Sequence, residues 1–292
     1  MTNDLKTLEG FVLTLWNAII LGIVQGIAEF LPISSSGHLS VLQNLFHMST
    51  AEEGHMFFDV MLHFGTLVSI CIVYWKDIVA MVTETLQFLS GKGRQKTPDG
   101  KTRSLPAARM VLMIIFATLP LVLIMPVKDK VEQLYYHTFA IGLFFIITGC
   151  ILFVSDKMPR GDRSEKTMRV KDALIIGLCQ CVATIPGISR SGSTITAGMA
   201  TGLDRDFAVK FSFMMSIPAV LGASLLTLVD AIQAGIDVSL LPVYLAGTVV
   251  STVVGVFAIK LVKSITSKGK FGNFAYYCWT VGVLTLLLSL LF

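Results

Sequence analysis

A glycine- and hydroxyl-rich segment with a single arginine, GISRSGST at 187–194, lies between long apolar stretches. A second polar segment, ISSSGH at 33–38, follows Glu29. The side chain of Arg190 presents a planar set of N–H donors that matches phosphate oxygens. Carboxylates, hydroxyls and an imidazole such as that of His38 can bind metals, transfer protons or attack phosphorus. These residue types together predict a site for phosphoryl chemistry.

The rest of the chain is strongly apolar. Of its 292 residues, 54% are hydrophobic and 14% are charged, and the mean hydropathy is +0.75, whereas soluble domains carry about 25% charged residues. The net charge of +4 comes from basic residues confined to loops, which argues against a nucleic-acid partner. The five cysteines lie inside apolar runs and are read as packing residues. We therefore predict a single all-α membrane domain, 1–292, that contacts membrane lipids.

Six apolar runs have the length of a membrane-spanning helix, at about 56–75, 107–127, 137–155, 207–229, 239–262 and 275–292. Lysine and arginine accumulate on the cytoplasmic side of membrane proteins. Of the 23 such residues, 19 lie in four segments, 76–109, 156–171, 202–210 and 260–273. The connections at 128–136 and 230–238 hold two basic residues and none, so we expect them on the outer face.

With the basic segments in the cytoplasm and the six runs crossing the membrane in turn, residues 11–46 enter and leave the membrane on the outer side. Residues 172–201 enter and leave it on the cytoplasmic side. Both segments are too polar at their midpoints to cross as plain helices, so we predict two re-entrant helix-turn-helix pairs. Residues 17–38 and 172–193 align without gaps at an offset of 155 and share nine of 22 positions. The chain is therefore expected to contain two inverted repeats, about 11–155 and 172–292, whose broken tips meet near the bilayer midplane.

The two copies differ at the positions that carry chemistry. Glu29 aligns with Thr184, Ser35 with Arg190, and His38 with Ser193. We assign phosphate binding to Arg190 and to the hydroxyls and amides around it. The further hydroxyl groups expected to bind phosphate are those of Ser34, Ser36, Ser189, Ser191 and Thr194.

Gln25 and Glu29 are four residues apart on one helix face and could hold a divalent cation, Mg²⁺ or Ca²⁺, through oxygen ligands. His38 or Ser35 would supply or activate the nucleophile. A structural alternative exists for these residues: an ion pair between Glu29 and Arg190 that joins the repeats, with His38 as an interior histidine.

Two further residues, Asp59 and His63, also share a helix face. We interpret them as part of a hydrated helix start in preference to a metal-binding or site-supporting role.

The chain resembles the bacterial undecaprenyl-diphosphatases of the bacitracin-resistance type. Residues 25–38, QGIAEFLPISSSGH, are similar to the family's (E/Q)xxxE region with its serines and histidine. Residues 186–194, PGISRSGST, are similar to its PGxSRSxxT region. The first acidic position of many members is Gln25 here. By contrast, the phosphohistidine motifs of the acid phosphatase-like lipid phosphatases are absent.

The resemblance implies hydrolysis of undecaprenyl diphosphate to undecaprenyl phosphate, which recycles a lipid carrier for cell-wall synthesis. It also implies a divalent cation, an inverted-repeat fold in the bacterial inner membrane, and a site reached from the outer face. The functional set carried over is Glu29, Ser35, His38, Ser189, Arg190 and Thr194. A transporter or flippase of a polyprenyl phosphate lipid is the alternative. The nucleophile and the oligomeric state stay open, a homodimer included.

Overall fold

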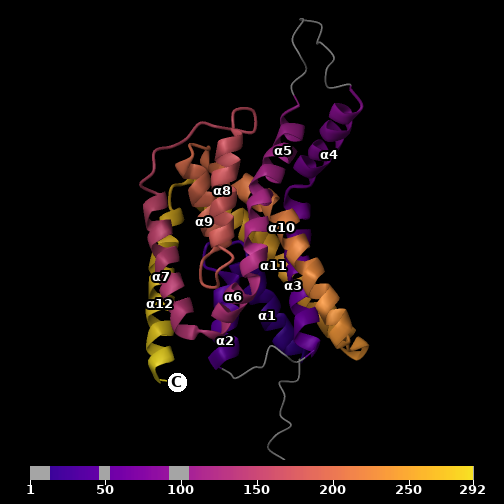
Figure 1. Cartoon of the computed structure of the whole chain (residues 1–292), viewed down its shortest axis with the longest axis vertical. Helices are drawn as coiled ribbons and strands as arrows, with labels where there is room; N and C mark the ends of the chain where they lie inside the picture. Colours follow the sequence, from indigo (N-terminus) through magenta and orange to yellow (C-terminus); the bar gives the residue numbers. More distant parts are fainter. Residues whose placement is uncertain (1–13, 46–52, 92–104, 292) are drawn as a thin grey trace, which may run out of the picture.

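The computed structural model describes residues 14–45, 53–91 and 105–291. In these three ranges every regular element is a helix (Figure 1), which confirms the predicted all-α class. The elements are α1 Leu15–Ala28, α2 Ser35–Leu45, α3 Glu53–Val73, α4 Trp75–Leu89, α5 Pro106–Thr118, η2 Leu119–Val127, α6 Lys128–Gln133, η3 Leu134–Tyr136, α7 Thr138–Ser155, α8 Val170–Val182, α9 Arg190–Ala200, α10 Arg205–Ala234, η4 Val238–Leu240, α11 Leu241–Ser267, η5 Phe271–Asn273 and α12 Phe274–Leu291. The ends of the predicted 11–46 pair lie outside the described residues.

Five helical segments within the described ranges are long and apolar enough to cross a membrane, and a bent pair, α3 with α4, would be a sixth. The chain is thus a multi-pass membrane protein. The five are Pro106–Val127, Thr138–Ser155, Arg205–Gln233, Val238–Ser267 and Phe271–Leu291. The first of these narrows to a 3₁₀ helix, η2, over its second half. Pro120 and Pro126 lie in η2, and proline disfavours a regular α-helix because it lacks an N–H.

The helix observed at 56–75 differs from the predicted straight span. α3 ends at Val73, and the chain turns by 80° into α4, a helix inside the stretch 76–109 that we predicted as a loop. α4 is amphipathic: Val79, Val82 and Leu86 are exposed at helical spacing. The charged residues of the polar face made this stretch resemble a loop in sequence.

The four basic segments meet at one end of the molecule. Arg109 donates a hydrogen bond to the carbonyl of Met168 (2.7 Å). Arg205 lies 3.6 Å from Asp156 and also contacts the carbonyl of Thr266 (3.4 Å). In Figure 1 this end, with the start of α8, lies at the top, and α6 and the C-terminus lie at the bottom. The predicted grouping of the loops into two faces therefore agrees with the fold.

The two helix-turn-helix pairs lie in opposite halves of the molecule, with α1 and α2 below and α8 and α9 above in Figure 1. Their helix limits follow the offset seen in the sequence. α2 runs from 35 to 45 and α9 from 190 to 200, each 155 residues later. α1 and α8 likewise begin at 15 and 170. The duplicated sequence thus forms the same local structure twice.

Close packing of small residues holds one face of α1 against the bundle. α11 packs along both α1 and α3. A Cβ atom on Gly26 would lie 2.8 Å from the carbonyl oxygen of Ser251, and one on Gly65 would lie 2.6 Å from that of Thr248. Such close backbone approach is typical of helices that pack in membranes. It fixes the end of α1, where Glu29 follows.

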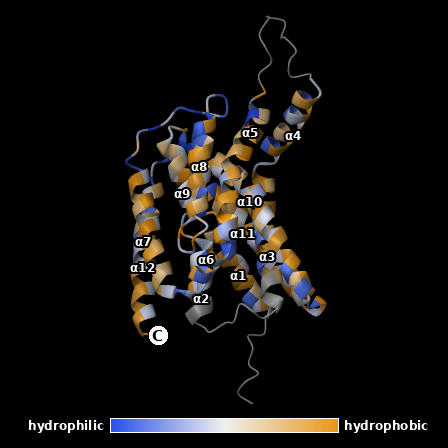
Figure 2. Cartoon of the chain, in the orientation of Figure 1, coloured by the Kyte–Doolittle hydropathy of each residue, from blue (hydrophilic) through white to orange (hydrophobic). Residues whose placement is uncertain are grey.

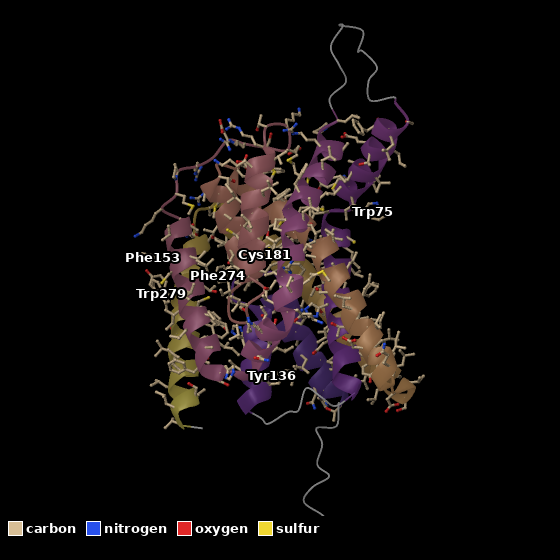
Figure 3. The ribbon with its side chains drawn as sticks, viewed as in Figure 1. Trp75, Tyr136, Phe153, Cys181, Phe274 and Trp279 are labelled. Atoms are coloured by element: carbon tan, nitrogen blue, oxygen red, sulfur yellow. The ribbon has the colours of Figure 1, made fainter. Side chains whose placement is uncertain are left out.

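The outer surface of the spans is apolar. Phe257 and Leu225 are among many large side chains that are more than half exposed, and Figure 2 shows apolar residues along α7, α10 and α12. Trp75 and Tyr136 are exposed in the upper and lower halves of the molecule in Figure 3, as expected for aromatic side chains at the two membrane interfaces.

Candidate functional site

The first tip joins α1 to α2. Between them, Ser34 has a φ of 66°, in the left-handed region that a residue with a side chain adopts only when its surroundings hold it there. The Ser34 hydroxyl accepts a hydrogen bond from the N–H of Gly37 (3.3 Å) and lies 3.5 Å from the hydroxyl of Ser36. This turn sets the direction in which α2 begins at Ser35.

The second tip joins α8 to α9 with the same kind of serine cap, although its left-handed residue lies at a different position. Gly187 has a φ of 92°, which glycine adopts without strain. Ser189 caps α9, and its hydroxyl accepts from the N–H of Gly192 (3.1 Å). Thr148 of α7 holds this tip by accepting from the N–H of Ser189 (3.1 Å) and donating to the carbonyl of Gly187 (2.9 Å). The capping serine and the glycine three residues later therefore recur at both tips.

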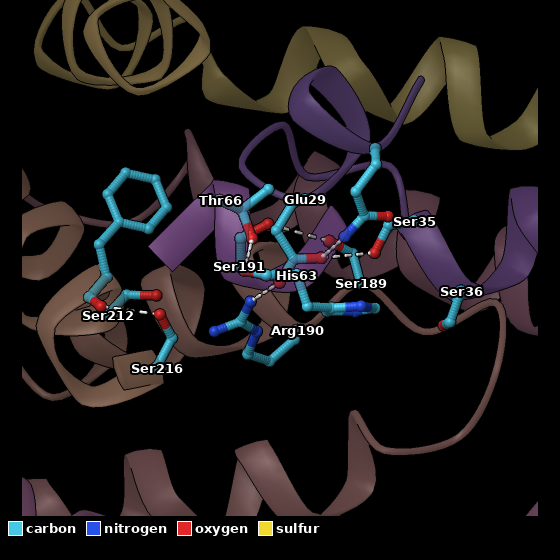
Figure 4. A network of polar contacts seen from close by, with 12 residues as sticks. Glu29, Ser35, Ser36, His63, Thr66, Ser189, Arg190, Ser191, Ser212 and Ser216 are labelled. Atoms are coloured by element: carbon cyan, nitrogen blue, oxygen red, sulfur yellow. Dashed lines mark hydrogen bonds and ion pairs between the residues drawn. The ribbon is translucent and has the colours of Figure 1, made fainter. Parts of the chain in front are cut away.

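The two tips are in direct contact. The guanidinium of Arg190 donates to Oε1 of Glu29 and forms an ion pair with it, as Figure 4 shows. The hydroxyl of Ser191 donates to the carbonyl of Leu31 (3.1 Å). The structure thus brings together a carboxylate from the first copy and a guanidinium from the second, the pairing that the structural alternative also predicts.

The second oxygen of Glu29 accepts two more hydrogen bonds. The hydroxyl of Ser35 donates to Oε2 over 2.8 Å, and the amide of Gln25 donates to the same atom over 3.1 Å. Glu29 is buried, with 8% of its surface exposed, and buried carboxylates require such partners. A serine hydroxyl is therefore held against a carboxylate beside the arginine.

His38 does not join this network. Its Nδ1 lies 2.8 Å from the carbonyl of Ser34, which can only accept, so Nδ1 carries a proton. In the neutral ring Nε2 then accepts from the hydroxyl of Tyr277, also 2.8 Å away. The ring packs edge-on against Phe145 of α7 (4.9 Å between centroids) and stacks on Tyr277 of α12. Both ring nitrogens of His38 are therefore engaged away from the ion pair.

The other predicted phosphate-binding residues lie around the two helix starts. Ser36 and Ser191 are close to the capping serines of their own tips (3.5 and 3.3 Å between hydroxyl oxygens). Thr194 donates to the carbonyl of Arg190 (2.8 Å), and its hydroxyl lies 2.6 Å from that of Ser212 on α10. Thr194 thus ties the first turn of α9 to the bundle.

Sequence reasoning missed His63 of α3. Figure 4 draws the ring of this residue beside Glu29 and Arg190. We predicted a hydrated helix start for Asp59 and His63, whereas the structure places His63 at the contact of the two tips. The spacing of Asp59 and His63 was the available signal, but nothing in the sequence showed which helix α3 would face.

The donor set suits a hard cation only in part. Within the described ranges, no three histidine, cysteine, aspartate or glutamate side chains form a metal-binding group. Gln25 and Glu29 lie side by side as expected, and carboxylate, amide and hydroxyl oxygens are the ligands that Mg²⁺ and Ca²⁺ prefer. A single carboxylate leaves most of the coordination shell to other oxygens. The residues present therefore fit a cation that is shared with a bound phosphate.

Comparison with known proteins identifies close relatives. A family model described as bacitracin resistance protein BacA matches residues 18–284. An undecaprenyl-diphosphatase of Methanosphaera stadtmanae is 40% identical over 282 residues, which cover 95% of this chain and 99% of the relative. One from Alkaliphilus metalliredigens is 40% identical over 284 residues, covering 96% and 100%. The undecaprenyl-diphosphatase 3 of Bacillus cereus is 35% identical over 273 residues, covering 93% and 96%.

Proposed function

Because the chain belongs to the bacitracin resistance protein BacA family, we propose that the joined hairpin tips are the active site of an undecaprenyl-diphosphatase. The enzyme hydrolyses undecaprenyl diphosphate to undecaprenyl phosphate and inorganic phosphate. The observation that carries the assignment of the site is the contact of Arg190, Glu29 and Ser35 across two separate hairpins. We also propose that the reaction recycles the carrier lipid at the bacterial inner membrane.

The diphosphate of the substrate would bind at Arg190 and the start of α9. Arg190 is the first residue of α9, and the first N–H groups of a helix have no carbonyl partner within the helix. The guanidinium, the N–H groups of Arg190 and Ser191 and the hydroxyl of Ser189 form a donor-rich surface suited to phosphate oxygens, and the Ser191 hydroxyl would join it by leaving the carbonyl of Leu31. Phosphate would compete with Glu29 for Arg190 and so release the carboxylate to act on Ser35.

Ser35 is the nucleophile that the geometry favours. Its hydroxyl already donates to Glu29 (2.8 Å), whereas both nitrogens of His38 have other partners. In the proposed step, the Ser35 oxygen forms a bond to the terminal phosphorus as its proton passes to Glu29. The bond from that phosphorus to the bridging oxygen breaks, and undecaprenyl phosphate leaves with this oxygen. Arg190 stabilises the charge that develops on the transferring group.

The prenyl chain of the substrate would lie along α1. Trp16, Ile20, Ile23 and Ile27 are between 37% and 75% exposed and form a stripe on one face of this helix. The stripe ends at Ile27, two residues before Glu29, which follows the end of α1. α1 and α2 lie in the half of the molecule opposite to the basic segments, which supports access from the outer face.

A transporter would share this architecture, because paired hairpins also occur in carriers. The two functions separate in detergent, where no membrane sides exist. We expect the purified protein to release inorganic phosphate from undecaprenyl diphosphate with a linear dependence on protein concentration. A preparation that binds the lipid but releases no phosphate would favour transport instead.

We propose that a divalent cation assists the reaction. Glu29, with the side-chain oxygen of Gln25, would hold it together with phosphate oxygens, and the cation would neutralise charge on the diphosphate. We expect chelation with EDTA to lower phosphate release at least about tenfold, and added Mg²⁺ or Ca²⁺ to restore it. Activity that is unchanged after dialysis against EDTA would contradict the cation.

A further inference from the structure

His63 has one ring nitrogen engaged and one available. Its Nδ1 lies 2.9 Å from the backbone carbonyl of Asp59, one helical turn earlier. A carbonyl only accepts, so Nδ1 carries the proton and the neutral ring presents a lone pair at Nε2. Among the described residues, this nitrogen has no hydrogen-bond partner, in contrast to Nε2 of His38, which contacts Tyr277. His63 is therefore the imidazole with an available acceptor.

The position of His63 puts that acceptor at the reaction centre. The ring lies beside Glu29 and Arg190 in Figure 4. The side chain is half-buried. The hydroxyl of Thr66 donates to the carbonyl of His63 (2.7 Å), and α3 is packed against α1, α10 and α11. The ring is thus carried by a helix that the bundle holds in place.

The reaction needs a group that orients water. If Ser35 takes the phosphoryl group, a water molecule must then attack phosphorus. Ser35 donates to Glu29, and Arg190 can only donate. Oε2 of Glu29 holds the proton from Ser35 at that stage, so only its Oε1 is left for the cation. An additional acceptor near the phosphoryl group is therefore required.

We propose that His63 positions the attacking water by accepting a hydrogen bond at Nε2. The inference rests on the proposed function and adds a residue to it. The water oxygen forms a bond to phosphorus, and the bond from Ser35 to phosphorus breaks. One water proton passes to Nε2 and then leaves to solvent, while the proton held by Glu29 returns to the Ser35 oxygen. The products are inorganic phosphate and the starting enzyme.

Two amide substitutions separate this role from a structural one. An asparagine at position 63 can replace Nδ1 and keep the contact with Asp59, but it is too short to replace Nε2. A glutamine reaches the position of Nε2 with an oxygen that accepts. Water positioning therefore predicts that His63→Gln is the more active variant, whereas a structural role through Asp59 predicts that His63→Asn is.

The experiment measures phosphate release and the phosphoenzyme after rapid quenching, with undecaprenyl diphosphate labelled at its terminal phosphorus. We expect His63→Asn to lower kcat roughly a hundredfold with KM changed less than about threefold, and to accumulate label on the protein. His63→Gln should recover at least about tenfold of that loss. His137→Gln, an exposed histidine at the start of α7, is the matched control.

Three results would overturn the role of His63: a His63→Asn enzyme with normal kcat, equal losses in both variants, or a change confined to KM. The thermal unfolding midpoint of each purified variant identifies a folding defect, and His63→Gln keeps the test valid if His63→Asn is unstable. Failure of the proposed function would look different, because the unmodified enzyme would then release no phosphate or Ser35→Ala would remain active.

Discussion

Arg190→Lys is expected to lower kcat/KM for undecaprenyl diphosphate by at least about a hundredfold, although the positive charge remains. Lysine offers a compact ammonium in place of the planar fork that contacts Glu29 and would bind phosphate oxygens in pairs. Alanine is a less informative substitution, because removing one partner of a buried ion pair costs about 3–5 kcal/mol of folding free energy. Steady-state phosphate release in detergent is the measurement.

The matched control for this substitution is Arg163→Lys. Arg163 also forms an ion pair, with both carboxylate oxygens of Asp172 (3.0 Å each), and contacts the carbonyl of Thr201 (2.8 Å). It lies among the basic segments at the far end of the molecule, so its loss is expected to affect stability and not turnover. Near-normal phosphate release by Arg190→Lys, or an equal loss of activity in both variants, would remove Arg190 from its assigned role.

Ser35→Ala and Glu29→Gln should each reduce kcat at least roughly a thousandfold, and the double variant should be no worse than either single one. The reason is that the two side chains act as one unit: Ser35 attacks only while Glu29 accepts its proton across the 2.8 Å contact. The measurement is kcat for the four proteins of the cycle. Multiplicative losses in the double variant would show that the two residues act independently.

The acid stability of the phosphoenzyme identifies the residue that attacks phosphorus. A phosphoserine survives acid, whereas a phosphohistidine is acid-labile, so acid treatment of trapped phosphoenzyme separates attack by Ser35 from attack by His38. Acid-stable label at residue 35 is expected. Ser40→Ala serves as the matched control, because Ser40 lies on the next turn of α2 and donates to the carbonyl of Ser36 (2.9 Å). Its kcat should remain close to that of the unmodified enzyme.

Much of the fold follows from composition and from the duplicated segment. Hydropathy located the five long spans, and the positions of lysine and arginine grouped the loops, because both patterns report on the bilayer directly. The alignment of 17–38 with 172–193 anticipated that α2 and α9 would begin at equivalent residues. The amphipathic α4 was not recognised, because its charged residues match those of a loop.

The site was predictable as a list of residues but not as a geometry. The sequence offered the pair of Glu29 and Arg190 only as the structural alternative, on the ground that two buried opposite charges require each other. It could not distinguish His38 from His63. That choice depends on the faces that α2 and α3 present, and those are set by the contacts of α2 with α7 and of α3 with α1 and α11. Tyr277, which takes the free nitrogen of His38, comes from the last helix of the chain.

Ser35 and Arg190 are the first residues of α2 and α9, and so occupy one and the same register of two duplicated hairpins. The proposed nucleophile and the arginine therefore stand at one aligned position of the two copies, whereas Glu29 of the first copy aligns with Thr184 of the second. Since the hairpins come from opposite halves of the molecule, the different side chains at the two tips make the proposed site asymmetric between those halves. Exchanging the two sets of side chains would build the same proposed site with the roles of the two hairpins, and so of the two halves of the molecule, reversed.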